Sequence, residues 1–120
     1  MQTRRGKSFQ QLVMEAKSRI REVPLTEFMR WRSENRPLVI LDVREPEQFD
    51  AEHIPQAIKA PRGILELEID EMVPDQDATI VCYCGGGSRS ALAADTLQAM
   101  GYENVYSLVG GFRGWSQSNG

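Results

Sequence analysis

Residues 79–101 constrain the fold more than any other part of the chain. They begin with an apolar run rich in β-branched residues, which is typical of a buried strand. The run ends at Cys84 and is followed by three glycines and a serine. Arg89 then opens a segment with the apolar period of a helix, and Gly101 is placed to end it. This pattern predicts a strand, a glycine-rich turn and a helix, with Cys84 where the strand gives way to the turn.

This position gives Cys84 the surroundings of a nucleophile. Consecutive glycines can turn their N–H groups inward as an anion-binding nest, and a helix start adds unpaired N–H groups. Arg89 adds a full positive charge with planar donor geometry. Thiols in comparable sites have pKa values of roughly 3.5 to 7.5, against about 8.5 for a free cysteine. We therefore predict a reactive thiolate at Cys84; the alternative interpretation is a structural cysteine in the core.

Other sites built on glycine turns do not fit this sequence. A P-loop needs a Lys-Ser/Thr pair to close the turn, and no such pair follows Gly85, Gly86 and Gly87. A CxxC redox pair does not fit, because Cys82 and Cys84 are separated by one residue. We expect their side chains to point to opposite faces of the strand, with Cys82 in the core.

Four blocks of the sequence resemble the rhodanese (thiosulfate sulfurtransferase) superfamily. The block Cys84-Gly85-Gly86-Gly87-Ser88-Arg89 is similar to the six-residue Cys-x4-Arg active loop of that family. The other blocks are Leu41-Asp42-Val43-Arg44 with Pro46 and Phe49, His53-Ile54-Pro55-Gln56-Ala57, and Gly110-Gly111-Phe112-Arg113-Gly114-Trp115. Their order and spacing make the match specific, and it covers roughly residues 22–116. Glu52 and Gln56 stand where the family often has glycine, in a turn away from the loop.

The resemblance implies a fold and a reaction. The fold is α/β, with three layers (α/β/α) around a central, mostly parallel sheet of about five strands; the alternation of strands and helices favours the same arrangement. The reaction moves a sulfane sulfur from thiosulfate or a similar donor to cyanide, a thiol or a protein cysteine, through a persulfide on Cys84. No metal or organic cofactor is implied, and with His53 as the only histidine a His-based metal site cannot be assembled.

The resemblance also assigns roles to residues around the cysteine. Cys84 is the catalytic residue, and the donor is bound by Gly85, Gly86, Gly87, Ser88 and Arg89. Asp42 and Arg44 are assigned to support of the loop. From the residues themselves we favour an ion pair or hydrogen-bond pair that fixes the Arg44-Glu45-Pro46 turn over direct catalysis.

Two alternative functions remain open. A persulfide carrier or interaction module would keep Cys84 but have little turnover of its own. A phosphatase-like or arsenate-reductase-like enzyme is less favoured, because such relatives carry Cys-x5-Arg loops and position 90 is a serine here. A phosphate group is also larger than a sulfur atom and needs the longer loop.

We divide the chain into an N-terminal extension, residues 1–21, and a rhodanese domain, residues 22–120. The extension contains a predicted amphipathic helix over residues 8–21, with a capping box formed by Ser8 and Gln11. Its apolar stripe consists of Phe9, Leu12, Val13, Ala16 and Ile20. We favour packing of this helix on its own domain over a role in dimerisation or partner binding, because a lone helix of this length is marginal in water.

Periodicity predicts the other elements of the domain. We expect helices over residues 24–35 and 62–70, strands over 38–43, 57–61 and 105–109, and a short terminal helix. Trp31 lies off the apolar stripe of its helix and is expected to cover an edge, whereas Ile64, Leu65 and Ile69 are expected to be buried.

Charge and composition limit the partners. A net charge of −3 argues against general nucleic-acid binding, so attraction of an anionic donor must be local. The two cysteines make no disulfide framework and no apolar run reaches membrane-spanning length, which favours the cytoplasm. The expected partners are a small anionic sulfur donor, a thiol or cyanide acceptor and an acceptor protein, without nucleic acid or membrane. We expect a monomer or a weak homodimer.

Overall fold

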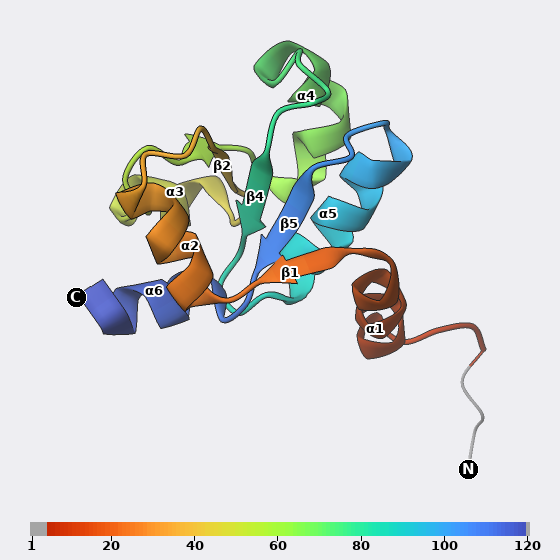
Figure 1. The fold of residues 1–120 in the computed structure, drawn as a ribbon. Helices are drawn as coiled ribbons and strands as arrows, with labels where there is room; N and C mark the ends of the chain where they lie inside the picture. The colour runs from red at the N-terminus through yellow and green to blue at the C-terminus, as the bar shows by residue number, and fades with distance from the viewer. Residues whose placement is uncertain (1–4, 120) are drawn as a thin grey trace.

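A single parallel sheet organises the computed structural model, which describes residues 5–119 (Figure 1). Its strand order is β1-β5-β4-β2-β3, and every neighbouring pair is parallel. The strands are β1 (Arg21–Val23), β2 (Val39–Asp42), β3 (Ile58–Lys59), β4 (Ile80–Tyr83) and β5 (Val105–Leu108). The helices are α1 (Phe9–Arg19), α2 (Leu25–Ser33), α3 (Pro46–Ala51), α4 (Leu65–Met72), α5 (Ser88–Ala99) and α6 (Gly111–Asn119), with a 3-10 turn η1 (Arg62–Ile64). The predicted α/β fold with a parallel sheet of about five strands is confirmed.

Helices cover both faces of the sheet and bury a separate core on each (Figure 1). Apolar residues of α4 and α5 pack on one face, and α1 lies against α5. Residues of α2 and α6 pack on the other face. The central strand β4 is buried along its whole length because it contributes to both cores.

The side chains of β4 alternate between the two cores. Cys82 and Cys84 belong to the core under α4 and α5, whereas Val81 and Tyr83 belong to the core under α2 and α6. The prediction that the two cysteines point to opposite faces is therefore wrong, because residues two apart in a strand share a face. Cys82 is fully buried in the core, as predicted.

Helix α1 differs from its prediction in the width of its buried stripe. The predicted capping box is present, since Gln11 N donates to Ser8 Oγ (3.2 Å) and Ser8 N donates to Gln11 Oε1 (2.7 Å). Of the five stripe residues, only Val13 and Ala16 are buried, and Phe9 and Leu12 are 52% and 45% exposed. The stripe extends beyond the contact of α1 with α5, so the side chains of Phe9 and Leu12 lie in solvent.

Polar contacts add to the packing of α1 on α5. Arg19 donates from Nε and Nη2 to the two carboxylate oxygens of Asp95 (2.9 and 2.7 Å), and Gln98 Nε2 donates to Arg19 O (3.0 Å).

Strand β1 begins at Arg21 and therefore crosses the predicted boundary between the extension and the domain. Within residues 5–119, no helix has both the length and the apolar character that a membrane span requires.

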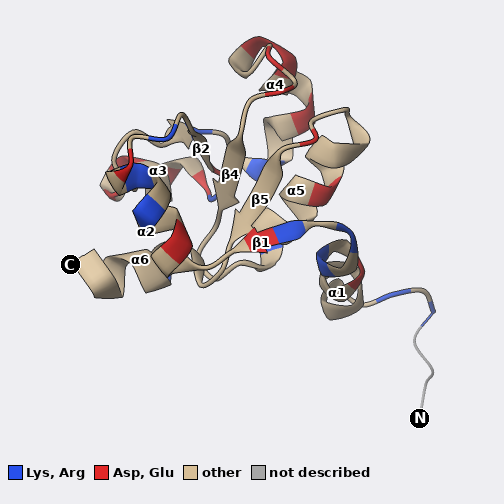
Figure 2. Ribbon diagram, viewed as in Figure 1, with Lys and Arg blue, Asp and Glu red and all other residues tan. Residues whose placement is uncertain are grey.

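Two further burial predictions are wrong. Trp31 is buried, because its ring packs edge-on against Tyr106 (5.1 Å between centroids) and its Nε1 donates to Glu27 Oε1 (2.9 Å). Ile64 is 41% exposed, because the predicted helix over residues 62–70 starts as the 3-10 turn η1, whose tighter period turns this side chain outward. In α4, which follows this turn, the acidic side chains are exposed to solvent (Figure 2).

Candidate active site

Cys84 lies at the carboxyl edge of the sheet, between β4 and the start of α5. The strand ends at Tyr83, and α5 starts at Ser88 after the left-handed Gly87 (φ +108°). Residues other than glycine rarely adopt this backbone conformation. The predicted order of strand, glycine turn and helix is confirmed, and it puts the cysteine where open α/β sheets place their ligands.

The sulfur of Cys84 is enclosed by hydrogen-bond donors. Gly87 N and Ser90 N donate to Sγ at 3.1 and 3.4 Å. Sγ also lies 3.5 Å from Ser90 Oγ, and that hydroxyl lies 2.8 Å from Ser107 Oγ on β5. The residue is only 2% exposed, so these donors replace water around the sulfur. The loop therefore points its amides toward the thiol, as an anion-binding nest does.

These hydrogen bonds lower the pKa of Cys84. Burial on its own raises the pKa of the thiol, because charge is poorly solvated in the interior. The Ser90 hydroxyl and the N–H groups of Ser90, Gly87 and Gly86 act in the opposite direction and leave the pKa of Cys84 below its ordinary value. Burial raises the pKa of Cys82 to about 12, with a further contribution from Cys84 against a small lowering by Arg62. The two neighbouring thiols are therefore chemically distinct.

Alkylation as a function of pH tests this difference. Iodoacetamide reacts with thiolate, so the rate at Cys84 should rise with pH and level off below the value of about 8.5 at which a free cysteine is half ionised. Ser90→Ala removes one donor to the thiolate and should move the profile to higher pH. Cys82 should stay unmodified until the protein is unfolded in denaturant. A Cys84 midpoint at or above that of free cysteine would contradict the assignment.

The first turn of α6 holds the loop from the other side. Phe112 N donates to Cys84 O (2.8 Å) and Arg113 N donates to Gly85 O (3.1 Å). Gly111 has a φ of +54°, and a Cβ atom there would lie 2.5 Å from Cys84 O and 2.8 Å from Gly85 O. A side chain at position 111 is therefore excluded by both the backbone angle and the contact.

Two glycines of α6 provide a matched pair of variants. Gly111→Ala should destabilise the protein by about 2–4 kcal/mol, because it combines left-handed strain with a backbone clash. Gly114→Ala should stabilise it by about 0.5–1 kcal/mol, because a Cβ there meets no atom within 4 Å and alanine favours the helix. Urea unfolding of both variants measures the difference. Equal effects would show that the close approach of Gly111 is not required.

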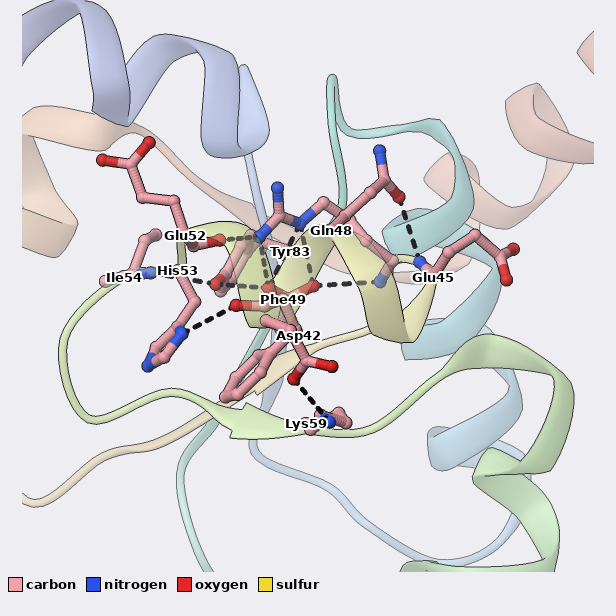
Figure 3. A network of polar contacts seen from close by, with 11 residues as sticks. Asp42, Glu45, Gln48, Phe49, Glu52, His53, Ile54, Lys59 and Tyr83 are labelled. Carbon is pink, nitrogen blue, oxygen red and sulfur yellow. Dashed lines mark hydrogen bonds and ion pairs between the residues drawn. The ribbon is translucent and has the colours of Figure 1, made fainter.

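Asp42 and Arg44 form a buried ion pair beside the loop. Arg44 Nη2 donates to Asp42 Oδ2 (2.7 Å), and Arg44 Nε and N both donate to Asp42 Oδ1 (3.0 Å each). Tyr83 OH donates to Asp42 Oδ2 (2.7 Å) and accepts from Ile54 N (3.1 Å), while Arg44 Nη2 also donates to Glu52 O (2.7 Å) (Figure 3). Burial, followed by the hydrogen bond to Asp42, raises the pKa of Tyr83, which keeps its hydroxyl protonated as a donor.

This network reaches the active loop through one aromatic ring. The Arg44 guanidinium lies over Phe112, 4.2 Å from the ring centroid, and the N–H of Phe112 binds Cys84 O. Within the residues that the structure describes, neither Asp42 nor Arg44 bonds to the sulfur of Cys84. Support of the loop by this pair remains a prediction with a defined physical route.

The other predicted site residues surround Cys84 in different ways. The N–H groups of Gly86 and Gly87 face the sulfur. The carbonyl oxygen of Gly85 accepts a hydrogen bond from Arg113 N in α6, and Ser88 is the first residue of α5. Arg89 is half-exposed, with Nη1 3.6 Å from Glu45 Oε1. Binding of a donor by these residues remains a prediction.

Sequence reasoning missed three residues of the site. Ser90 was considered only as the position of a phosphatase arginine, although it contributes both its amide and its hydroxyl to the sulfur. Ser107 is a polar residue inside an apolar run, which signals a buried partner but not its identity. Arg113 was visible in the Gly110–Trp115 block without any indication of its neighbours. Among residues 5–119, no three His, Cys, Asp or Glu side chains gather closely enough to hold a metal ion.

The fold and the site define an α/β protein with a cysteine loop at the carboxyl edge of a parallel sheet, in which backbone amides donate to the sulfur. The family model of the rhodanese-like domain matches residues 25–118, and the chain belongs to this family. The resemblance seen in the sequence is thereby confirmed.

Relatives carry names from sulfur metabolism. The chain is 34% identical to "Putative sulfur carrier protein YrkF" of Bacillus subtilis over 82% of its length, but it spans only about half (52%) of that protein. It is 38% identical to "Thiosulfate sulfurtransferase GlpE" of Pseudomonas syringae over 64% of this chain and 71% of that one. A solved structure from Rhodopseudomonas palustris superposes with a TM-score of 0.88 at 32% identity, covering 100% of this chain and 97% of the other. That protein is described as of unknown function and a possible tyrosine phosphatase.

Proposed function

We propose that this protein is a thiosulfate sulfurtransferase that works through a persulfide on Cys84. The observation that carries the proposal is the sulfur itself, which accepts hydrogen bonds from Gly87 N and Ser90 N inside a six-residue loop. Donors fixed in this way stabilise a negative sulfur without reorganisation during the reaction. The names of the relatives support the same chemistry.

The proposed reaction is a double displacement. The Cys84 thiolate attacks the outer sulfur of thiosulfate, a new S–S bond forms, and the S–S bond of thiosulfate breaks. Sulfite leaves with the electron pair of the broken bond, so three negative charges are present before and after the step. A thiophilic acceptor then takes the outer sulfur of the persulfide and restores the thiolate. Cyanide serves as acceptor in an assay, and a thiol or a protein cysteine serves in the cell.

A two-assay comparison tests the proposal. After incubation with thiosulfate, intact-protein mass spectrometry should show the addition of one sulfur atom, and cyanide should then release thiocyanate and restore the original mass. Aryl-phosphate hydrolysis by the same preparation should stay at background. Phosphate release without sulfur uptake would overturn the proposal in favour of a phosphatase.

The relative named as a sulfur carrier supports a second candidate function. A carrier would load Cys84 from a persulfide on another protein and hand the sulfur to a partner, with little turnover of thiosulfate. Slow thiosulfate turnover together with rapid loading from a persulfidated protein would select this function. In both cases two free cysteines suit a reducing compartment such as the cytoplasm.

A further inference from the structure

Arg113 places a positive charge over the loop that holds Cys84. A Cβ atom on Gly86 would lie 3.1 Å from Arg113 Nη2 and 3.5 Å from Cζ, and a Cβ atom on Gly85 would lie 3.5 Å from Nη2. The guanidinium therefore lies against both glycines, at ordinary van der Waals distance from a Cβ on Gly85 and closer than that to a Cβ on Gly86. The absence of a side chain on Gly86 leaves room for this close approach.

The backbone of Arg113 is attached to the same loop. Its N–H donates to Gly85 O, and the preceding residue, Phe112, donates to Cys84 O. The close approach of Gly111 to both carbonyls keeps the first turn of α6 in this place. These short contacts fix the backbone of Arg113 beside the loop, so its side chain starts next to Gly85 and Gly86.

The Arg113 side chain has no hydrogen bond or ion pair within residues 5–119. The other arginines near the site are engaged: Arg44 with Asp42 in the interior, Arg89 with Glu45, and Arg62 with Glu66 and Thr96. Arg113 is also exposed, so an ion arriving at the loop meets its donors without breaking a contact. A guanidinium in this state matches the oxygens of a planar or tetrahedral oxyanion.

We propose that Arg113 binds the oxygen-bearing end of the sulfur donor and makes the site prefer doubly charged, thiosulfate-type donors over donors of lower charge. This inference rests on the proposed function. In this proposal the outer sulfur of thiosulfate contacts Cys84 and its sulfonate group lies by Gly85 and Gly86, next to the Arg113 guanidinium. As the S–S bond of the donor breaks, negative charge grows on the departing sulfite, and a guanidinium beside it stabilises that charge.

Two donors that differ by one charge test the proposal. Thiosulfate and methanethiosulfonate both transfer an outer sulfur, and they release sulfite and methanesulfinate respectively. For Arg113→Gln, kcat/KM for thiosulfate should fall about tenfold, because the dianion is bound less tightly and the departing sulfite is less stabilised, while the value for methanethiosulfonate should fall about threefold or less. Arg113→Glu should enlarge the difference, and Arg113→Lys should restore part of it.

Arg36→Gln is the matched control, because it removes the same charge from an exposed position just before β2, at the opposite edge of the sheet. This variant should leave both donors unaffected. Unchanged kinetics in Arg113→Gln, or equal losses with both donors, would overturn the role of Arg113 and leave the proposed function intact. Failure of the wild type to load sulfur from either donor would instead refute the proposed function and this inference with it.

Discussion

The Cys84→Ser variant is expected to fold normally and to lose sulfur uptake, with kcat/KM for thiosulfate reduced by about 10³-fold or more. A serine hydroxyl is close to the thiol in size and can accept the same hydrogen bonds from Gly87 N and Ser90 N. It does not ionise near neutral pH, however, and cannot form a persulfide. Intact-protein mass spectrometry after thiosulfate treatment, with steady-state kinetics, measures both consequences.

Cys82→Ala provides the control, since it removes the neighbouring thiol from the same face of β4. This residue is fully buried, and its truncation should cost about 1 kcal/mol of stability. Sulfur uptake should remain at the wild-type level, because the pKa of Cys82 is raised and its thiol is out of reach of the donor. Equal sulfur uptake by wild type and Cys84→Ser would remove Cys84 from the proposed role.

Asp42→Ala is expected to cause the largest loss of stability, about 3–5 kcal/mol, because it leaves a charge without its partner in the interior. Arg44 is only 5% exposed, and three of its N–H groups, including its backbone amide, bond to the Asp42 carboxylate. Tyr83 OH would also lose its acceptor. Unfolding in urea, followed by fluorescence, measures the free energy of unfolding.

Asp95→Ala is the matched control for this variant. Asp95 pairs with Arg19 in a similar bidentate geometry, but the Arg19 side chain is 55% exposed. Removing this surface pair should cost less than about 1 kcal/mol. Equal decreases in the free energy of unfolding of the two variants would show that burial does not make the Asp42–Arg44 pair more important for stability than a surface pair. Slower alkylation of Cys84 in folded Asp42→Ala would support the predicted role of the pair in holding the loop.

The elements with a clear local signal were predicted well. The apolar run before Cys84 forms β4. Helix α5 begins directly after Gly87 and ends just before Gly101, as predicted. The capping box at Ser8 starts α1 as predicted. Each of these signals acts within a few residues, so the chain alone contains the necessary information.

Predictions that depended on distant neighbours failed. Phe9 and Leu12 carry the pattern of a buried stripe, but α5 offers no surface to cover them. Trp31 is off its helical stripe and is nevertheless buried, because Tyr106 on β5 provides a partner. Helical periodicity describes which residues share a face and does not say how much of that face another element covers.

The sequence by itself determined that one cysteine follows a buried strand and precedes a helix, because the turn that encloses its sulfur is made of consecutive residues. It also determined the family, through blocks whose order and spacing are readable along the chain. Only the tertiary structure decided which remote groups meet that loop: Ser107 behind the sulfur, the Asp42–Arg44 pair beside it and Arg113 over its glycines. These groups come from strands and helices that are brought together by sheet pairing and packing, and no local pattern encodes their distance from Cys84.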